Sequence, residues 1–409
     1  MRCGSLRQVI IWHITDRGNF ILSYSKQHKW LYLIAFPVGH GAVDWGGGAL
    51  WLLAPAMAIS MGLTPVQVGI LFAARQLGSG LSQLPAGFIG DHLRRRGRFL
   101  LATFWWVSVA QLAASGSANY WVVVGFLTLA SAGAGAWHPV AMGVMTQWMP
   151  GRKAFVLGMH LMGGTVAEIT APLLVGVLLM HLSWNQALVI NTIPTIILGL
   201  VFIKLAPMVI APPQFLGGRV DIRWLVKAML QPGSLAVLLA ITLHNMSLIA
   251  FLSMAPLYFQ EVLGFSSSLT GLGVSLFLIG GAAISPFVGY ISDKIGRKLM
   301  ATGGLIGGGV CAWFITLASG NVAIFPLLII TGILMLSVRS VIIAMALEKV
   351  GHRESTVLGL ISSVGEGVAA LGAVLAGIMG GINLAFAVIL AAILSVIAGM
   401  VIWPVTSKR

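Results

Sequence analysis

The sequence predicts an all-α membrane protein in which twelve transmembrane helices form two pseudo-symmetric six-helix bundles. Of the 409 residues, 58% are hydrophobic and only 8% are charged, whereas a soluble domain carries about 25% charged residues. Apolar runs of about 20 residues, each long enough to cross a hydrocarbon core, recur along nearly the whole chain. Short motifs of the first half also recur in the second half at a nearly constant spacing.

Six apolar runs lie on each side of one long polar stretch. The expected spans are 31–59, 65–89, 99–117, 120–147, 154–180 and 184–204, then 234–259, 267–291, 299–318, 322–347, 355–379 and 384–403. We therefore expect a bundle at 30–204, a cytoplasmic linker at 205–233 and a second bundle at 234–404. Residues 1–29 are expected to form a basic cytoplasmic extension, and residues 405–409 a cytoplasmic tail.

The net charge of +14 is distributed in a pattern typical of membrane proteins. All 24 Lys and Arg residues except Arg75 and Arg339 fall in the N-terminal segment, in every second loop or in the C-terminal tail. This alternation is the positive-inside rule. It argues against nucleic-acid binding, and it predicts a multi-pass protein of the inner (cytoplasmic) membrane with both termini in the cytoplasm. The two cysteines, Cys3 and Cys311, imply no disulfide framework.

The repeats indicate that one half arose by duplication of the other. The segment from Gly87 to Asp91 recurs as Gly289 to Asp293, 202 residues later. Two other segments recur 201 residues later: Val156 to Gly158 as Val357 to Gly359, and Ala54-Pro55 as Ala255-Pro256. Internal repeats of this kind are the usual construction of secondary transporters.

The loops that follow the second and eighth spans resemble the signature of the major facilitator superfamily. The second-half copy is complete, with Gly289, Asp293, Lys294, Gly296, Arg297 and Lys298. In the first-half copy, Gly87, Asp91 and His92 are followed by Arg94, which replaces the expected Gly, so we expect an altered turn there. The resemblance implies that Asp91 and Asp293 cap a neighbouring helix and, with Lys294, Gly296 and Arg297, gate the conformational change. The alternative is that these loops only fix the topology.

Two further spans are similar to the fosmidomycin-resistance-type efflux group within that superfamily. They contain Trp137-His138-Pro139-Val140-Ala141, then Gly158, Gly163-Gly164 and Ala171-Pro172-Leu173-Leu174. The sequence departs from the group at Arg75, Thr165, Ala167, Glu168 and Ala171. Because these departures fall where a substrate is expected to bind, the drug specificity of the group is not transferred.

Five acidic or basic residues and four histidines lie deep inside the expected spans. They are Asp44, Arg75, Glu168, Arg339 and Glu366, with His40, His138, His160 and His244. A charge at the centre of a span costs about 2.5–3.5 kcal/mol, so these groups must be paired, hydrated or neutralised. They avoid the third, sixth, ninth and twelfth spans, which the resemblance places against lipid. We therefore expect all nine to line a central cavity.

Three of these residues are expected near the middle of the bilayer. With a rise of about 1.5 Å per residue, Asp44, Arg75 and Glu168 reach similar depths in the first half. Our hypothesis is that Asp44 or Glu168 neutralises Arg75, which leaves one carboxylate to take up a proton. Glu168 is the first candidate for proton coupling and Asp44 the second. The alternative is a static ion pair that locks three spans together.

The remaining groups predict substrate contacts. His138 and Arg339 occupy equivalent positions of the repeat, 201 residues apart, and Arg makes bidentate contacts with anionic groups. We expect Arg75, His138 and Arg339 to contact substrate and Glu366 to hold Arg339 between transport events. His40, His160 and His244 are expected to be hydrogen-bonded interior histidines, because no His or Cys cluster has the spacing of a metal site.

These observations predict a secondary active transporter that works by alternating access, because the chain has no phosphate-binding loop for a nucleotide. The first hypothesis is proton-coupled export of a small polar or anionic compound. The alternative is proton-coupled or facilitative uptake of an organic or inorganic anion. A third possibility is a membrane protein that does not transport, and an enzyme is the least supported because no nucleophile–base motif occurs. The expected partners are a small-molecule substrate, protons and lipid, and we expect a monomer without cofactor or metal.

Overall fold

The computed structural model describes residues 26–149, 152–211, 227, 230–318, 323–350 and 354–405, and these contain helices and no strands. The first half comprises α1 (Lys26–Met61), α2 (Pro65–His92), α3 (Arg96–Ser115), α4 (Tyr120–Trp148), α5 (Lys153–Leu178), α6 (Trp184–Asn191), α7 (Ile193–Leu205) and the short 3-10 turn η2 (Ala206–Met208). The second half comprises α9 (Pro232–Glu261), α10 (Ser267–Ile295), α11 (Arg297–Ile315), α12 (Ile324–Leu336), α13 (Val338–Val350), α14 (Glu354–Ile382) and α15 (Leu384–Ile402).

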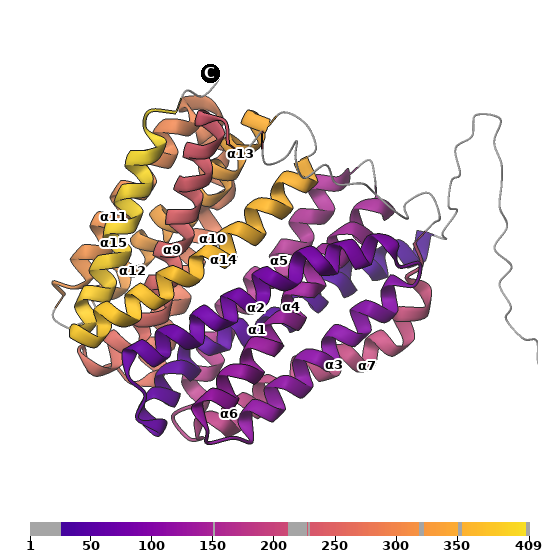
Figure 1. Ribbon diagram of the computed structural model, residues 1–409, viewed down its shortest axis with the longest axis horizontal. Coiled ribbons are helices and arrows are strands. Elements are labelled where there is room, and N and C mark those ends of the chain that lie inside the picture. Colours follow the sequence, from indigo (N-terminus) through magenta and orange to yellow (C-terminus); the bar gives the residue numbers. More distant parts are fainter. Residues whose placement is uncertain are drawn as a thin grey trace, which may run out of the picture.

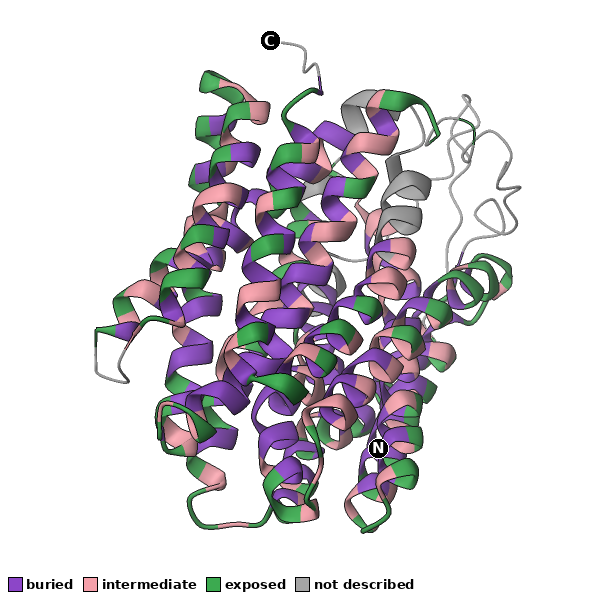
Figure 2. Ribbon diagram, turned by 60° about the vertical axis from the view of Figure 1, so that its left-hand side comes forward, coloured by how far each residue is buried: buried purple, intermediate pink, exposed green. Residues whose placement is uncertain are grey.

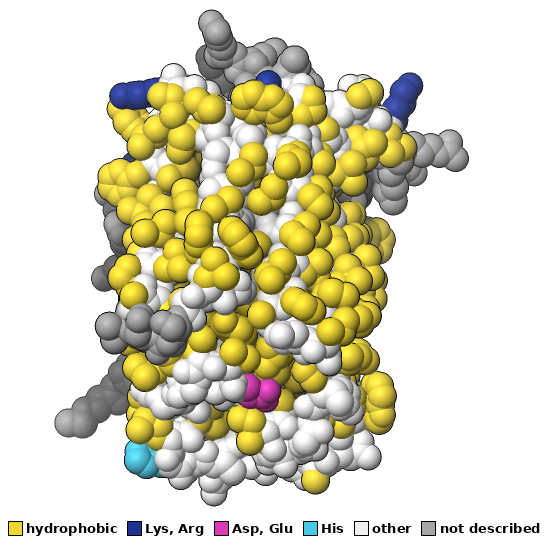
Figure 3. Space-filling model, turned by 90° about the vertical axis from the view of Figure 1, so that its left-hand side faces the viewer, with side chains coloured by type: hydrophobic (Ala, Val, Ile, Leu, Met, Phe, Trp, Pro, Cys, Tyr) yellow, Lys and Arg dark blue, Asp and Glu magenta, His cyan; other side chains and the backbone are white. Residues whose placement is uncertain are grey.

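The helices confirm the prediction of twelve spans. Ten helical segments of the described residues are long and apolar enough to cross a membrane, and α2 and α3 complete the set. The sixth span is divided into α6 and α7, and the tenth into α12 and α13. Hydrophobic side chains cover the face seen in Figure 3, as expected for a surface in contact with lipid. Residues 1–25, most of the linker and residues 406–409 lie outside the described residues.

Local sequence signals determine where several helices begin. Thr64 and Gln67 form a capping box at the start of α2, in which Gln67 Oε1 accepts a hydrogen bond of 2.8 Å from the Thr64 amide. Asn119 and Asn383 accept hydrogen bonds from the first amides of α4 and α15. Pro194 has no amide proton, so its place in the first turn of α7 costs no hydrogen bond within the helix.

The two halves meet mainly along two pairs of helices, α2 with α14 and α5 with α10. Figure 1 shows the halves as separate bundles, with α14 lying alongside α2, and Figure 2 shows buried residues turned towards the inside of the structure. Glycines allow the close approach: a Cβ on Gly80 would lie 3.1 Å from the amide nitrogen of Gly367. Small residues are the usual means by which membrane helices pack closely.

Within the first half, α1 and α5 are in even closer contact. A Cβ on Gly163 would lie only 1.9 Å from the carbonyl oxygen of Pro37, and a Cβ on Gly164 would lie 2.6 Å from Nε2 of His40. Pro37 and His40 belong to α1, and both glycines belong to α5. The pair Gly163-Gly164, singled out in the sequence, therefore allows these two helices to touch at the level of the polar residues.

We predict that Gly163→Ala destabilises the protein, because the added methyl group collides with backbone that cannot move aside as a side chain would. The expected loss is about 1–3 kcal/mol, the usual range for overpacking, measured as a lower midpoint of thermal unfolding in detergent. Gly158→Ala is the matched control on α5, because nothing lies within 4 Å of its Cβ. It should leave stability unchanged or raise it by up to about 1 kcal/mol, since Ala is the better helix former. Equal midpoints for the two variants would contradict the close packing.

Candidate functional site

The polar centre of the first half is built around Asp44 of α1. Its Oδ2 lies 2.9 Å from Nε2 of His40, one helical turn earlier, and its Oδ1 lies 3.4 Å from Nε2 of His138 on α4. The Asp44 side chain is 22% exposed and that of His138 is 18% exposed. Asp44 is therefore engaged by two histidines, and its carboxylate remains partly accessible.

His160 of α5 completes a group of three histidines. Its carbonyl oxygen accepts a hydrogen bond of 2.6 Å from Nδ1 of His40, and its ring stacks on that of His40 with centroids 4.0 Å apart. The ring nitrogens of His40, His138 and His160 offer atoms that all lie within 4.8 Å of one another. These residues are distant in sequence and lie on three helices. Their spacing along the sequence therefore did not predict the cluster.

The predicted ion pair between Arg75 and a carboxylate is wrong. Within the described residues Arg75 forms no salt bridge and no hydrogen bond, and its guanidinium carbon lies 5.8 Å above the ring of Trp51. A Cβ on Gly47 would lie 2.3 Å from Nη2 of Arg75, so the glycine makes room for this group. Asp44, Glu168 and Glu366 are near enough to interact with Arg75 electrostatically, but the donors of the guanidinium remain available.

Glu168 lies on α5, and its side chain is exposed although it lies in the middle of a span. It forms no hydrogen bond and no ion pair with the described residues. Asp44, Arg75 and Arg339 are within electrostatic range of it. Glu168 is therefore within electrostatic range of an arginine from each half of the molecule.

Glu366 does not hold Arg339 as predicted. Its Oε2 accepts hydrogen bonds from Oγ of Ser79, at 2.8 Å, and from Nε2 of Gln83, at 2.7 Å. Both donors belong to α2, so these bonds join α14 to the other half. Sequence reasoning missed Ser79 and Gln83, because uncharged polar residues inside a span are common and carry no distinctive pattern.

Arg339 lies at the start of α13, two residues after the break at Ser337 that separates it from α12. Its side chain is exposed and makes no hydrogen bond or ion pair with the described residues. It interacts electrostatically with Glu168 and with His244 of α9. His138, its repeat equivalent, is instead engaged with Asp44. The two equivalent positions therefore differ in their surroundings.

The histidine predictions have mixed outcomes. His40 is hydrogen-bonded, as predicted. His160 and His244 are fully buried, and none of their ring nitrogens has a hydrogen-bond partner in the described part of the chain. A buried donor without a partner costs about 1–3 kcal/mol, so the prediction of satisfied interior histidines is wrong for these two residues.

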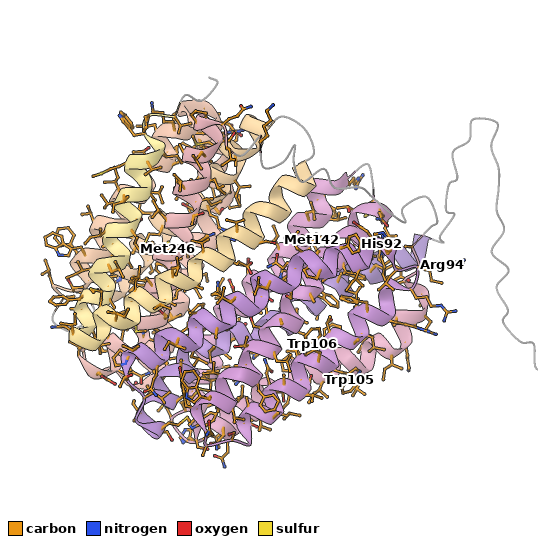
Figure 4. The ribbon with its side chains drawn as sticks, in the orientation of Figure 1. His92, Arg94, Trp105, Trp106, Met142 and Met246 are labelled. Atoms are coloured by element: carbon orange, nitrogen blue, oxygen red, sulfur yellow. The ribbon has the colours of Figure 1, made fainter. Side chains whose placement is uncertain are left out.

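The signature loops contain the expected charged residues in two different arrangements. In the second copy, Asp293 Oδ1 pairs with Nη2 of Arg297 at 2.8 Å, and Gly296 adopts a φ of 108° that favours glycine. In the first copy residues 93–95 separate α2 from α3, whereas Gly296 alone separates α10 from α11, so the turn is altered as predicted. There, Arg96 lies 3.8 Å from Asp91. His92 and Arg94 lie together at this end of α2 (Figure 4). Helix capping by Asp91 or Asp293 and gating by these loops remain predictions.

Comparison with known proteins defines the family. The family profile of the Major Facilitator Superfamily matches residues 38–272 and 235–409. The chain belongs to the major facilitator superfamily. This major facilitator protein is therefore a multi-pass transport protein of a lipid bilayer that binds a small-molecule substrate, and it is not an enzyme.

Two curated relatives of this major facilitator protein are transporters by name. A putative metabolite transport protein of Haemophilus influenzae is 23% identical over 284 residues, which cover 67% of this chain and 70% of the relative. A probable sulfoacetate transporter, SauU, of Cupriavidus necator is 26% identical over 291 residues, which cover 67% of this chain and 66% of the relative.

Solved structures share the fold of this major facilitator protein. A bacterial homologue of the human lysosomal transporter Spinster, in an inward-facing and unoccupied conformation, has a TM-score of 0.75 and 16% identity, covering 93% of this chain and 98% of that one. The nucleoside transporter NupG has a TM-score of 0.73 and 11% identity, covering 92% of this chain and 100% of that one.

We predict that Glu168 faces water and not lipid. In a background in which Cys3 and Cys311 are replaced by Ser, Glu168→Cys should react with a charged thiosulfonate, because such a reagent does not partition into hydrocarbon. Ala167→Cys is the control on the neighbouring position, since Ala167 is only 2% exposed and should not react. Mass spectrometry of the intact protein measures the labelling. An unreactive Glu168→Cys that still reacts with an uncharged maleimide would place the side chain in lipid.

Proposed function

We propose that this protein is a proton-coupled carrier of a small organic anion, which it binds together with a proton between its two halves. The observation that carries the proposal is the arrangement of Arg75, Arg339 and Glu168. One arginine comes from each half, neither has a carboxylate partner within salt-bridge distance among the described residues, and one exposed carboxylate is within electrostatic range of both.

The two arginines favour an anionic substrate. A charged side chain in the middle of a span is costly unless it has a function or a partner. Guanidinium groups bind carboxylate, sulfonate and phosphonate oxygens through pairs of parallel hydrogen bonds. A substrate held by Arg75 on α2 and Arg339 on α13 would contact both halves at once, as alternating access around a central site requires.

Glu168 supplies the coupling in this proposal. While it is ionised, its negative charge opposes the binding of an anion to the nearby arginines. When it takes up a proton, this repulsion is lost and the positive field of the arginines attracts the anion. Because such coupling is reciprocal, bound anion also favours the protonated form. A carrier that binds both together moves both in the same direction.

This coupling favours uptake by proton symport, which was the alternative in the sequence analysis, over export by antiport. Export of a small polar or anionic compound, the function of the fosmidomycin-resistance-type group, remains a prediction that rests on two spans. The named substrate of one relative, sulfoacetate, is a small organic anion, and this supports the choice of substrate class. Asp44, the second candidate for coupling, is engaged by two histidines, so Glu168 remains the first.

We expect that an inward proton gradient drives sulfoacetate, used as the first probe, into proteoliposomes that contain the purified protein. Glu168→Gln should abolish accumulation driven by the gradient while it retains exchange of labelled anion at equal pH on both sides. Glu261→Gln is the control, because this acid lies at the exposed end of α9 and should behave as the wild type. A steep proton dependence that survives in Glu168→Gln would show that the coupling assignment is wrong. Proton influx that drives anion efflux would instead support the export hypothesis.

The same assay tests the anion site. Arg339→Gln should raise KM for the anion at least about tenfold, since hydrogen bonds to charged groups contribute about 1.5–3 kcal/mol. Arg339→Lys keeps the charge but loses the bidentate geometry, so we expect a smaller rise in KM. An unchanged KM in both variants would exclude Arg339 from the substrate site.

A further inference from the structure

The cluster of His40, His138, His160 and Asp44 has no part in the anion site described above. Its four side chains come from three helices, α1, α4 and α5, and converge inside the first half. His160 is 0% exposed, and neither of its ring nitrogens has a partner among the described residues. A neutral imidazole always carries one N–H donor and one acceptor, so both are left unsatisfied beside two other imidazoles and a carboxylate.

We propose that His40, His138, His160 and Asp44 form a binding site for one divalent transition-metal ion of the zinc or cobalt type. Three imidazoles and one carboxylate are a set of four ligands that such ions accept in tetrahedral geometry. Magnesium and calcium prefer sites made entirely of oxygen ligands, so this cluster selects against them.

His40 is oriented as a metal ligand would be. The carbonyl oxygen of His160 can only accept a hydrogen bond, so Nδ1 of His40, 2.6 Å away, carries the proton. In the neutral ring Nε2 is then the unprotonated atom, and its lone pair is directed at Oδ2 of Asp44, 2.9 Å away. Two electron-rich atoms at this distance are held together either by a second proton on the ring, which makes it an imidazolium, or by a metal ion bound to both, and the proposed ion takes the place of that proton. A backbone carbonyl that fixes the far nitrogen is also the common arrangement around metal-bound histidines.

Ion binding requires a small movement of the rings. His40 and His160 are stacked with 17° between their planes, so both cannot direct a lone pair at one ion without rotation of a ring. Nitrogens bound to one tetrahedral ion lie about 3.3 Å apart, whereas the candidate atoms lie within 4.8 Å of one another. Rotation of the His160 ring breaks no hydrogen bond to a described residue, because its nitrogens make none.

An ion can also reach the cluster. Asp44 and His138 keep 22% and 18% of their side chains exposed, whereas His40 and His160 are buried behind them. The carboxylate and one imidazole therefore face accessible space, and the two inner rings complete the ligand set.

Cobalt(II) is the probe that tests this proposal, because its visible absorption reports the geometry of its ligands. The full-length, tag-free protein in detergent is titrated with Co²⁺, and bound metal is counted by equilibrium dialysis. We expect the strong absorption of a four-coordinate site, saturating at one Co²⁺ per chain, displaced by Zn²⁺ and unaffected by excess Mg²⁺. Absence of this absorption in the wild-type protein would overturn the proposal.

His160→Phe is the main variant, since it keeps a ring against His40 but removes both nitrogens. It should weaken Co²⁺ binding at least tenfold, and His138→Gln, on a different helix, should do the same. His244→Phe is the matched control, because His244 is equally buried and unpartnered but lies on α9 in the other half. It should bind Co²⁺ like the wild type. Unchanged binding in both His160→Phe and His138→Gln, or an equal loss in His244→Phe, would refute the site. None of these measurements involves anion transport, so the result is independent of the symport proposal.

Discussion

A charged side chain inside an apolar bundle must be hydrated, paired with an opposite charge or neutralised by a change of protonation, and this constraint organises the centre of the molecule. Each intramembrane ionisable residue meets the constraint differently. Asp44 is held by two histidines, and Glu366 accepts two hydrogen bonds from the opposite half. Glu168 remains within electrostatic range of both Arg75 and Arg339 without direct contact with either. The first two residues are therefore structurally engaged, whereas the last three are available for a ligand.

Glycine packing makes this arrangement possible. The α1 and α5 helices touch at Gly163, and α2 touches α14 at Gly80 and Gly367. Since lipid supplies no hydrophobic force between helices, close contact and polar bonds must hold the bundle together. The bonds from Ser79 and Gln83 to Glu366 occur in this second contact, so backbone proximity and cross-half hydrogen bonding stabilise the same interface.

The internal repeat is preserved in packing but not in charge. Gly164 lies against His40 and Asp44, and its equivalent Gly365 lies against Asn245, the equivalent of Asp44. An amide thus replaces a carboxylate, and Arg339 replaces His138, so the second half carries a fixed positive charge where the first half carries titratable groups. We infer that duplication supplied a symmetric scaffold and that later substitutions changed the polar residues at equivalent positions of the two halves.

The sequence by itself determined the number of spans, the division into two halves, the altered turn of the first signature loop and the set of ionisable residues inside the bundle. These features depend on local composition and on repeats, which need no knowledge of distant contacts. Only the tertiary structure decided which side chains meet. The histidine cluster joins residues 40, 138 and 160, the donors to Glu366 come from the other half, and Arg75 lies over Trp51 instead of pairing with Asp44. Such contacts depend on how each helix is rotated about its axis and how it crosses its neighbours. An error of one residue turns a side chain by about 100°. Hydrophobic patterning does not fix this rotation, because lipid and protein interior are equally apolar.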